Sequence, residues 1–141
     1  MRDVARRQAD AGPVEAYRFL ANEGRLRHLG PAFGTKYLHF VPQATSGEAL
    51  VLDAIVCRAI RKLADISLRP WQWRTAMYER YLSLVDGLAG DIGIAPSDVE
   101  MLLFVSELEV SGRWSGCRPT SDTAGDGVKC RLPVAALESH V

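Results

Sequence analysis

Two residues of this chain, Lys36 and Asp53, are of chemical types that can act together in covalent catalysis. Lys36 closes a stretch of small and apolar residues, and Asp53 follows 17 residues later, directly after three aliphatic residues. A lysine amine that has lost its proton is a nucleophile that forms a Schiff base with a sugar carbon. A carboxylate beside it stabilises the positive charge that develops on a sugar ring as its leaving group departs. Lys36 and Asp53 are therefore the candidate catalytic pair.

The residues around this pair predict the elements that hold it. Residues 29–36 read Leu-Gly-Pro-Ala-Phe-Gly-Thr-Lys, a small-residue turn between two short apolar helical patterns at 25–29 and 35–41. Residues 54–63 carry apolar side chains at helical spacing, and Asp53 directly precedes them, so we expect Asp53 to cap that helix. Capping would fix its carboxylate in one orientation. The pattern is a helix-hairpin-helix followed by a helix with an acidic start.

The hairpin, with Gly34-Thr35-Lys36 at the start of its second helix, and the later Leu-Val-Leu-Asp53 resemble the helix-hairpin-helix superfamily of base-excision DNA glycosylases. They are most similar to its 8-oxoguanine DNA glycosylase branch, over roughly residues 14–109. The resemblance implies a small or shortened enzyme with associated lyase activity that removes an oxidised purine rotated out of the duplex. Lys36 would attack the sugar, and Asp53 would be its electrostatic and proton-transfer partner. The partner implied is double-stranded DNA with a damaged base or abasic site, without a cofactor.

The hairpin also predicts a DNA contact. Small residues at Gly30, Ala32 and Gly34 allow the backbone to approach DNA closely, and N–H groups near Thr35 can hold a phosphate. The family usually has glycine where this chain has Ala32. Phe40 lies four positions after Lys36, so both project from one helix face. Phe40 is a candidate wall of the base pocket, but of the two alternatives core packing is favoured.

Each assignment has a plainer alternative. A lysine in a short helix is usually a solvated charge, and an aspartate before a helix is usually only a cap. Two other classes of function therefore stay open. One is a non-catalytic helix-hairpin-helix module that binds DNA, and the other is a helical interaction protein whose acidic C-terminal helices dock a partner.

Charge is unevenly distributed along the chain, although the formal net charge is zero. Residues 1–80 carry 13 Lys and Arg against 8 Asp and Glu, whereas residues 81–110 carry six acidic residues and no basic ones. This segregation allows a basic DNA-facing side and an acidic rear, with a mixed solvated surface as the alternative.

The cysteines point away from a metal site. Cys57, Cys117 and Cys130 have neither the four-cysteine spacing of an iron–sulfur cluster nor a paired zinc spacing. Cys57 is expected to pack on the apolar side of its helix. The odd number of cysteines, with no signal peptide and no long apolar run, predicts a cytoplasmic protein, associated with the nucleoid in a prokaryote.

The predicted fold is all-α, a compact helical bundle over residues 1–110 with an irregular or flexible tail at 111–141. A charged stretch comes first, and further helices are expected at 13–21, 71–90 and 97–109, the last capped by Ser97. Residues 42–49 are expected to form a loop. Trp71 and Trp73 lie between basic residues, and we favour packing over stacking on nucleic acid for both.

Overall fold

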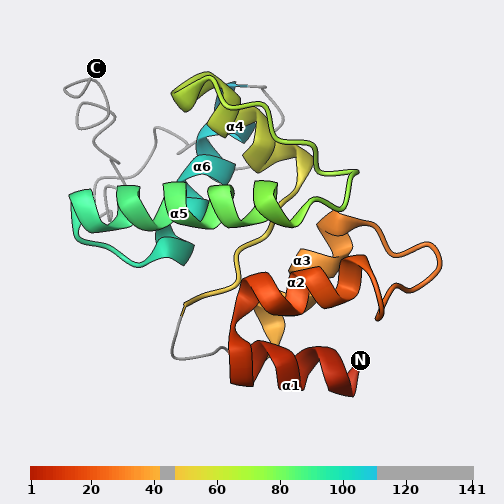
Figure 1. Ribbon diagram of the computed structural model, residues 1–141. Helices are drawn as coiled ribbons and strands as arrows, with labels where there is room; N and C mark the ends of the chain where they lie inside the picture. Colours follow the sequence, from red (N-terminus) through yellow and green to blue (C-terminus); the bar gives the residue numbers. More distant parts are fainter. Residues whose placement is uncertain (42–46, 111–141) are drawn as a thin grey trace, which may run out of the picture.

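The structure, a computed structural model, describes residues 1–41 and 47–110 (Figure 1). Within that part of the chain the regular elements are helices, so the prediction of an all-α fold is confirmed. The predicted domain boundary and irregular tail at 111–141 lie outside the described residues. The helices are α1 (Arg2–Ala11), α2 (Pro13–Ala21), α3 (Pro31–Phe40), α4 (Ala54–Ala64), α5 (Thr75–Ile92) and α6 (Pro96–Val110).

The helices form two groups, each of three consecutive elements (Figure 1). In the first group α2 packs against α1 and α3, and in the second α6 packs against α4 and α5. Contacts between α2 and α5 join the two groups. The non-helical segment 47–53 runs from one group to the other and delivers Asp53 to the start of α4.

Local sequence explains several of the helix boundaries. Pro13 and Pro31 occupy the first position of α2 and α3, where a fixed backbone angle helps and a missing N–H costs nothing. Gly93 ends α5 with a φ of 71°, the left-handed conformation that glycine adopts readily. On α4, Val56, Ala59 and Ile60 are buried at the spacing that places them on one face.

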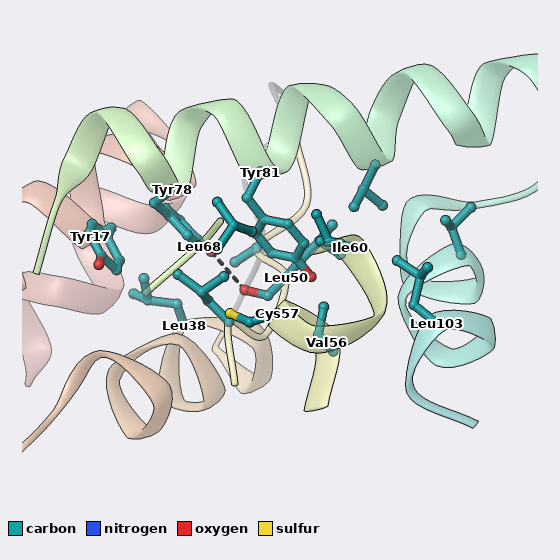
Figure 2. Close-up of a cluster of buried hydrophobic side chains, with 14 of the residues drawn as sticks. Tyr17, Leu38, Leu50, Val56, Cys57, Ile60, Leu68, Tyr78, Tyr81 and Leu103 are labelled. Atoms are coloured by element: carbon teal, nitrogen blue, oxygen red, sulfur yellow. Dashed lines mark hydrogen bonds between the residues drawn. The ribbon is translucent and has the colours of Figure 1, made fainter. Parts of the chain in front are cut away.

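A cluster of tyrosines forms the centre of the core (Figure 2). Tyr17, Tyr78 and Tyr81 are fully buried, and the rings of Tyr17 and Tyr78 stack with centroids 4.3 Å apart. Leu50 and Leu52, from the segment between the two groups, are each only 1% exposed. The core therefore encloses the segment that leads to Asp53.

The helical prediction at 25–29 is wrong. Residues 22–30 form turns and irregular backbone, and α3 begins at Pro31 rather than at residue 35. The helices that flank this connection are α2 and α3, which pack against each other. His28 has a φ of 68°, a left-handed conformation that interrupts any helix at this point.

Other predicted boundaries also shift. The charged stretch at the N-terminus is the helix α1, because Val4 and Gln8, one turn apart, bury a common face. The long helix starts at Thr75 instead of residue 71. The last helix starts at Pro96, so Ser97 lies inside it, where its N–H donates to Glu48 Oε2 at 3.3 Å. In the described part of the chain, no helix has the length and apolar character to cross a bilayer.

Candidate active site

Lys36 and Asp53 lie together. Lys36 Nζ is 3.9 Å from Asp53 Oδ2, and the lysine side chain is 47% exposed while that of the aspartate is 14% exposed. The other carboxylate oxygen, Oδ1, accepts hydrogen bonds from the N–H groups of Ile55 at 2.9 Å and Val56 at 3.0 Å. The predicted N-cap is thus confirmed. One oxygen of Asp53 caps α4, and the other is left to face the amine at the protein surface.

A buried threonine sets the register between the two residues. The Thr35 side chain is inaccessible to solvent, and its Oγ1 accepts the N–H of Leu52 at 2.9 Å while its hydroxyl donates to the Ala32 carbonyl at 3.2 Å. Because Lys36 follows Thr35 and Asp53 follows Leu52, this bond brings the amine and the carboxylate side by side. Thr35 therefore positions the pair from inside the fold.

Side chains also hold the backbone that leads to Asp53. The Tyr78 hydroxyl donates to the Leu50 carbonyl at 2.9 Å, and the Tyr81 hydroxyl donates to the Val51 carbonyl at 3.1 Å (Figure 2 shows both tyrosines over this segment). The Val51 N–H donates to Glu100 Oε2 at 3.0 Å. Buried backbone groups need such partners, since unpaired ones are costly. Side chains from α3, α5 and α6 thus fix the approach to Asp53.

Sequence reasoning missed this support. The sequence pattern singles out neither Tyr78 nor Tyr81 for this role, and it marks Glu100 only as one of the six acidic residues at 81–110. The available signal was weak. Two tyrosines three positions apart on one helix place two hydroxyls on the same side, but their acceptors lie about 30 residues away along the chain.

Glu100 is a half-buried acid close to this centre. Burial raises the pKa of Glu100 to about 7, and the negative charges of Asp53 and Glu48 act in the same direction. The hydrogen bond from Val51 and the charge of His39 oppose this increase. Glu100 thus changes charge near neutral pH while it holds the segment that carries Asp53.

Two exposed aromatic rings flank Lys36 on α3. Phe33 is 68% exposed and Phe40 is 84% exposed, and Lys36 Nζ lies 5.7 Å from the centroid of the Phe33 ring. The alternative that Phe40 packs in the core is therefore wrong. The centroid of the Phe40 ring lies 5.1 Å from that of the His39 ring. The exposed face of α3 thus presents an amine between two apolar rings.

The four candidate DNA-binding residues separate into two pairs. Gly30 caps the start of α3 with open space around it, and Ala32 is half-buried in the first turn. The helix start leaves the N–H groups of Ala32 and Phe33 without intrahelical acceptors. Gly34 and Thr35 are buried instead, and the Gly34 N–H already donates to Gly30 at 2.9 Å.

Packing explains the glycine at position 34. A Cβ there would overlap the indole of Trp73, so the absence of a side chain allows Trp73 to lie against α3. The expectation that small residues at the hairpin serve close approach to DNA is therefore compatible with Gly30 and Ala32. At Gly34 the close approach is to Trp73.

Cys57 packs as expected. It is 6% exposed on the buried side of α4, and burial raises the pKa of its thiol to about 12. Cys117 and Cys130 lie outside the described residues. Among residues 1–41 and 47–110, no group of three or more His, Cys, Asp or Glu side chains is arranged to hold a metal ion.

Comparison with known proteins places most of the chain in one family. Residues 2–104 match the model of the family described as "Putative 8-oxoguanine DNA glycosylase OGG-like protein". The match runs from α1 into α6 and includes both Lys36 and Asp53. No curated protein and no solved structure matches the chain.

Proposed function

The chain belongs to the OGG-like family, and we propose that it is a base-excision DNA glycosylase with lyase activity that acts on 8-oxoguanine through Lys36. One observation carries this proposal. Within the matched region, a buried hydrogen bond from Leu52 to Thr35 holds the Lys36 amine 3.9 Å from a carboxylate that is itself fixed by helix capping.

The chemistry follows from this geometry. The neutral Lys36 amine attacks C1′ of the damaged nucleotide as the bond from C1′ to the base breaks. The base leaves with the bonding electrons and takes a proton from solvent water. Asp53 Oδ2 takes a proton from the attacking nitrogen and stabilises the positive charge on the sugar. The nitrogen lone pair then breaks the C1′–O4′ bond, O4′ takes the proton back from Asp53, and the opened sugar is left as the Schiff base from which lyase chemistry proceeds.

Bound DNA would complete the environment of the amine. Lys36 is half-exposed in the free protein, so water reaches its amine. A strand laid over the face of Phe33, Lys36 and Phe40 would remove that water and bring the sugar to the amine. The exposed Phe40 ring offers a surface on which a base rotated out of the duplex can stack.

The start of α3 supplies the proposed phosphate contact. Gly30 leaves open space there, and the first-turn N–H groups at Ala32 and Phe33 point out of the helix end. These groups lie one turn before Lys36, so a phosphate held there would place the neighbouring sugar near the amine.

Borohydride trapping of the wild-type protein tests the proposal. The substrates are duplexes that contain 8-oxoguanine, an abasic site or no damage, and the readout is a covalent protein–DNA adduct. Adducts on both damaged duplexes, and none on the undamaged one, are expected. Salt-sensitive DNA binding without any adduct would favour the non-catalytic DNA-binding module, and the absence of DNA binding would favour the helical interaction protein.

A further inference from the structure

A hollow lies between the α2–α3 connection and the segment that precedes α5. Its volume is about 580 Å³, and its walls include Arg25 and Arg27 on one side, Trp71 and Trp73 on the other, and Pro31 at the start of α3. None of the residues that line it is acidic. Neither Lys36 nor Asp53 lines the hollow, although Gly30, at the proposed phosphate contact, does.

The two arginines of this hollow are available to a ligand. Arg25 and Arg27 are exposed, and in the described part of the chain neither has a carboxylate within 4.0 Å. Arg18 and Arg58, by contrast, are engaged by glutamates. Guanidinium groups in a concave surface without acids attract phosphate oxygens and bind them with paired hydrogen bonds.

The two tryptophans have different roles. Trp73 packs in the fold, because its ring lies 5.0 Å from that of Tyr17 and covers Gly34. Trp71 is 69% exposed, so the expectation of packing is wrong for this residue. An exposed indole beside unpaired arginines is the combination with which proteins bind the bases and phosphates of a nucleic-acid strand.

We propose that this hollow binds unpaired nucleotides of a DNA strand, with phosphates on Arg25 and Arg27 and a base stacked on Trp71. The nucleotides must be unpaired because bases in a duplex cover each other's faces, whereas Trp71 needs an uncovered base face. The identification of the strand as DNA rests on the proposed function. The preference for unpaired nucleotides rests on the exposed Trp71 ring in the hollow.

The position of the hollow relates it to the proposed reaction centre. Pro31 lies at its edge, and Lys36 follows five residues later, about 7.5 Å further along the helix axis. Gly34 faces Trp73, and Lys36 projects about 200° further round α3. The hollow and the Lys36 amine therefore lie on opposite sides of α3. Along the α3 axis they are separated by about the length of one nucleotide. Nucleotides left unpaired beside a rotated base could occupy it.

Binding of labelled oligonucleotides by the full chain tests this inference. The probes are a 12-nucleotide oligodeoxythymidylate and an undamaged 12-base-pair duplex, followed by fluorescence anisotropy. The wild type should bind the single strand more tightly than the duplex. Trp71→Ala should weaken single-strand binding by on the order of 10-fold, the effect of losing one stacked base.

Arginine variants test the phosphate contacts. Arg25→Gln combined with Arg27→Gln should reduce the slope of log affinity against log salt concentration by about 1.4, since each phosphate contact to a single strand contributes about 0.7. Arg61→Gln combined with Arg80→Gln removes the same charge from exposed sites on α4 and α5 and should leave the slope nearly unchanged. Circular dichroism checks folding of every variant.

Three results would overturn the inference: tighter binding of the duplex, unchanged single-strand affinity in Trp71→Ala, or equal slopes in the two double variants. Its failure is distinguishable from failure of the proposed function. Single-strand binding by the undamaged oligonucleotide needs no covalent step, so it is measured independently of borohydride trapping. If the wild type gives no adduct but binds the single strand in a Trp71-dependent manner, the proposed enzymatic function is wrong and the hollow remains a binding site.

Discussion

Two lysine–carboxylate pairs in the described part of the chain differ in how they are held. Lys62 Nζ lies 2.7 Å from Glu107 Oε2, and Arg58 occupies the other oxygen at 3.2 Å, so both oxygens of Glu107 are bound to cations. Lys36 lies 3.9 Å from a single oxygen of Asp53, whose second oxygen caps α4. We call the Lys62–Glu107 pair closed, because both carboxylate oxygens are bound to cations. In the Lys36–Asp53 pair the amine lies beside the carboxylate but is not within hydrogen-bond distance of it.

The difference indicates what each pair does. Glu107 is 5% exposed and joins α6 to α4, and the hydrogen bond from Lys62, together with that from Arg58, keeps the pKa of Glu107 below its ordinary value. Such a pair holds two helices together. In the Lys36–Asp53 pair the capping bonds fix the carboxylate, and the Thr35 bridge positions the backbone of both residues. The lysine side chain beyond that backbone can move toward a bound sugar.

Among the variants that keep Lys36, the largest effect is expected at Asp53. Asp53→Asn keeps an oxygen for the cap of α4 and removes the negative charge, so excision in a single turnover should slow by a factor on the order of 10² or more. Helical content and melting temperature should change little. Excision at the wild-type rate in a folded variant would show that the carboxylate charge has no role in the reaction. The distinction between a reactive Lys36–Asp53 pair and a structural Lys62–Glu107 pair would then be wrong.

A smaller effect is expected at the positioning hydrogen bond. Thr35→Val preserves shape but leaves the buried Leu52 N–H without an acceptor, which should lower the free energy of unfolding by about 1–3 kcal/mol. Urea unfolding measures this loss. Thr35→Ser keeps the hydroxyl and is the matched control. Single-turnover excision by Thr35→Val should also fall at a temperature where the variant is folded, while Thr35→Ser stays near the wild type.

A pH effect is expected from Glu100. Its folded-state pKa of about 7 lies above the ordinary value of 4.5, so the folded protein binds more protons than the unfolded chain between these values. Stability is therefore lost as pH rises from about 4.5 through 7. Glu100→Gln keeps an oxygen acceptor for the Val51 N–H and has no proton to release. Urea unfolding at pH 5 and pH 8 should show that the wild type loses stability relative to this variant; a constant difference would contradict the account.

The smallest effect is expected at the closed pair. Lys62→Gln should lower the free energy of unfolding by about 1 kcal/mol or less, because Lys62 is 57% exposed and Arg58 still contacts Glu107. Excision should be unchanged. A large loss of excision in this variant would break the distinction between a structural pair and a reactive one.

The sequence was sufficient for features that depend on near neighbours. The cap at Asp53 joins residues two and three positions apart, and the helical faces of α2 and α4 repeat every three or four residues. The proximity of Lys36 to Asp53 came instead from the resemblance to a family.

Features that depend on distant partners could not be predicted. The inward position of Thr35 is decided by Leu52, and the need for glycine at position 34 is decided by Trp73. The support from Glu100 spans 49 residues. At residues 25–29 the apolar pattern predicted a helix. Pro31 is instead the first residue of the next helix, α3, and residues 22–30 form turns and irregular backbone.

Schiff-base trapping with Lys36→Gln tests the central claim most directly. The amide cannot form a Schiff base, so the variant should give no adduct on 8-oxoguanine or abasic duplex in the presence of borohydride, while it still binds the duplex. Lys62→Gln, which removes the other lysine of the described residues, should give the wild-type amount of adduct. An active wild type with equal trapping by Lys36→Gln would contradict the account, because another amine would then be the nucleophile.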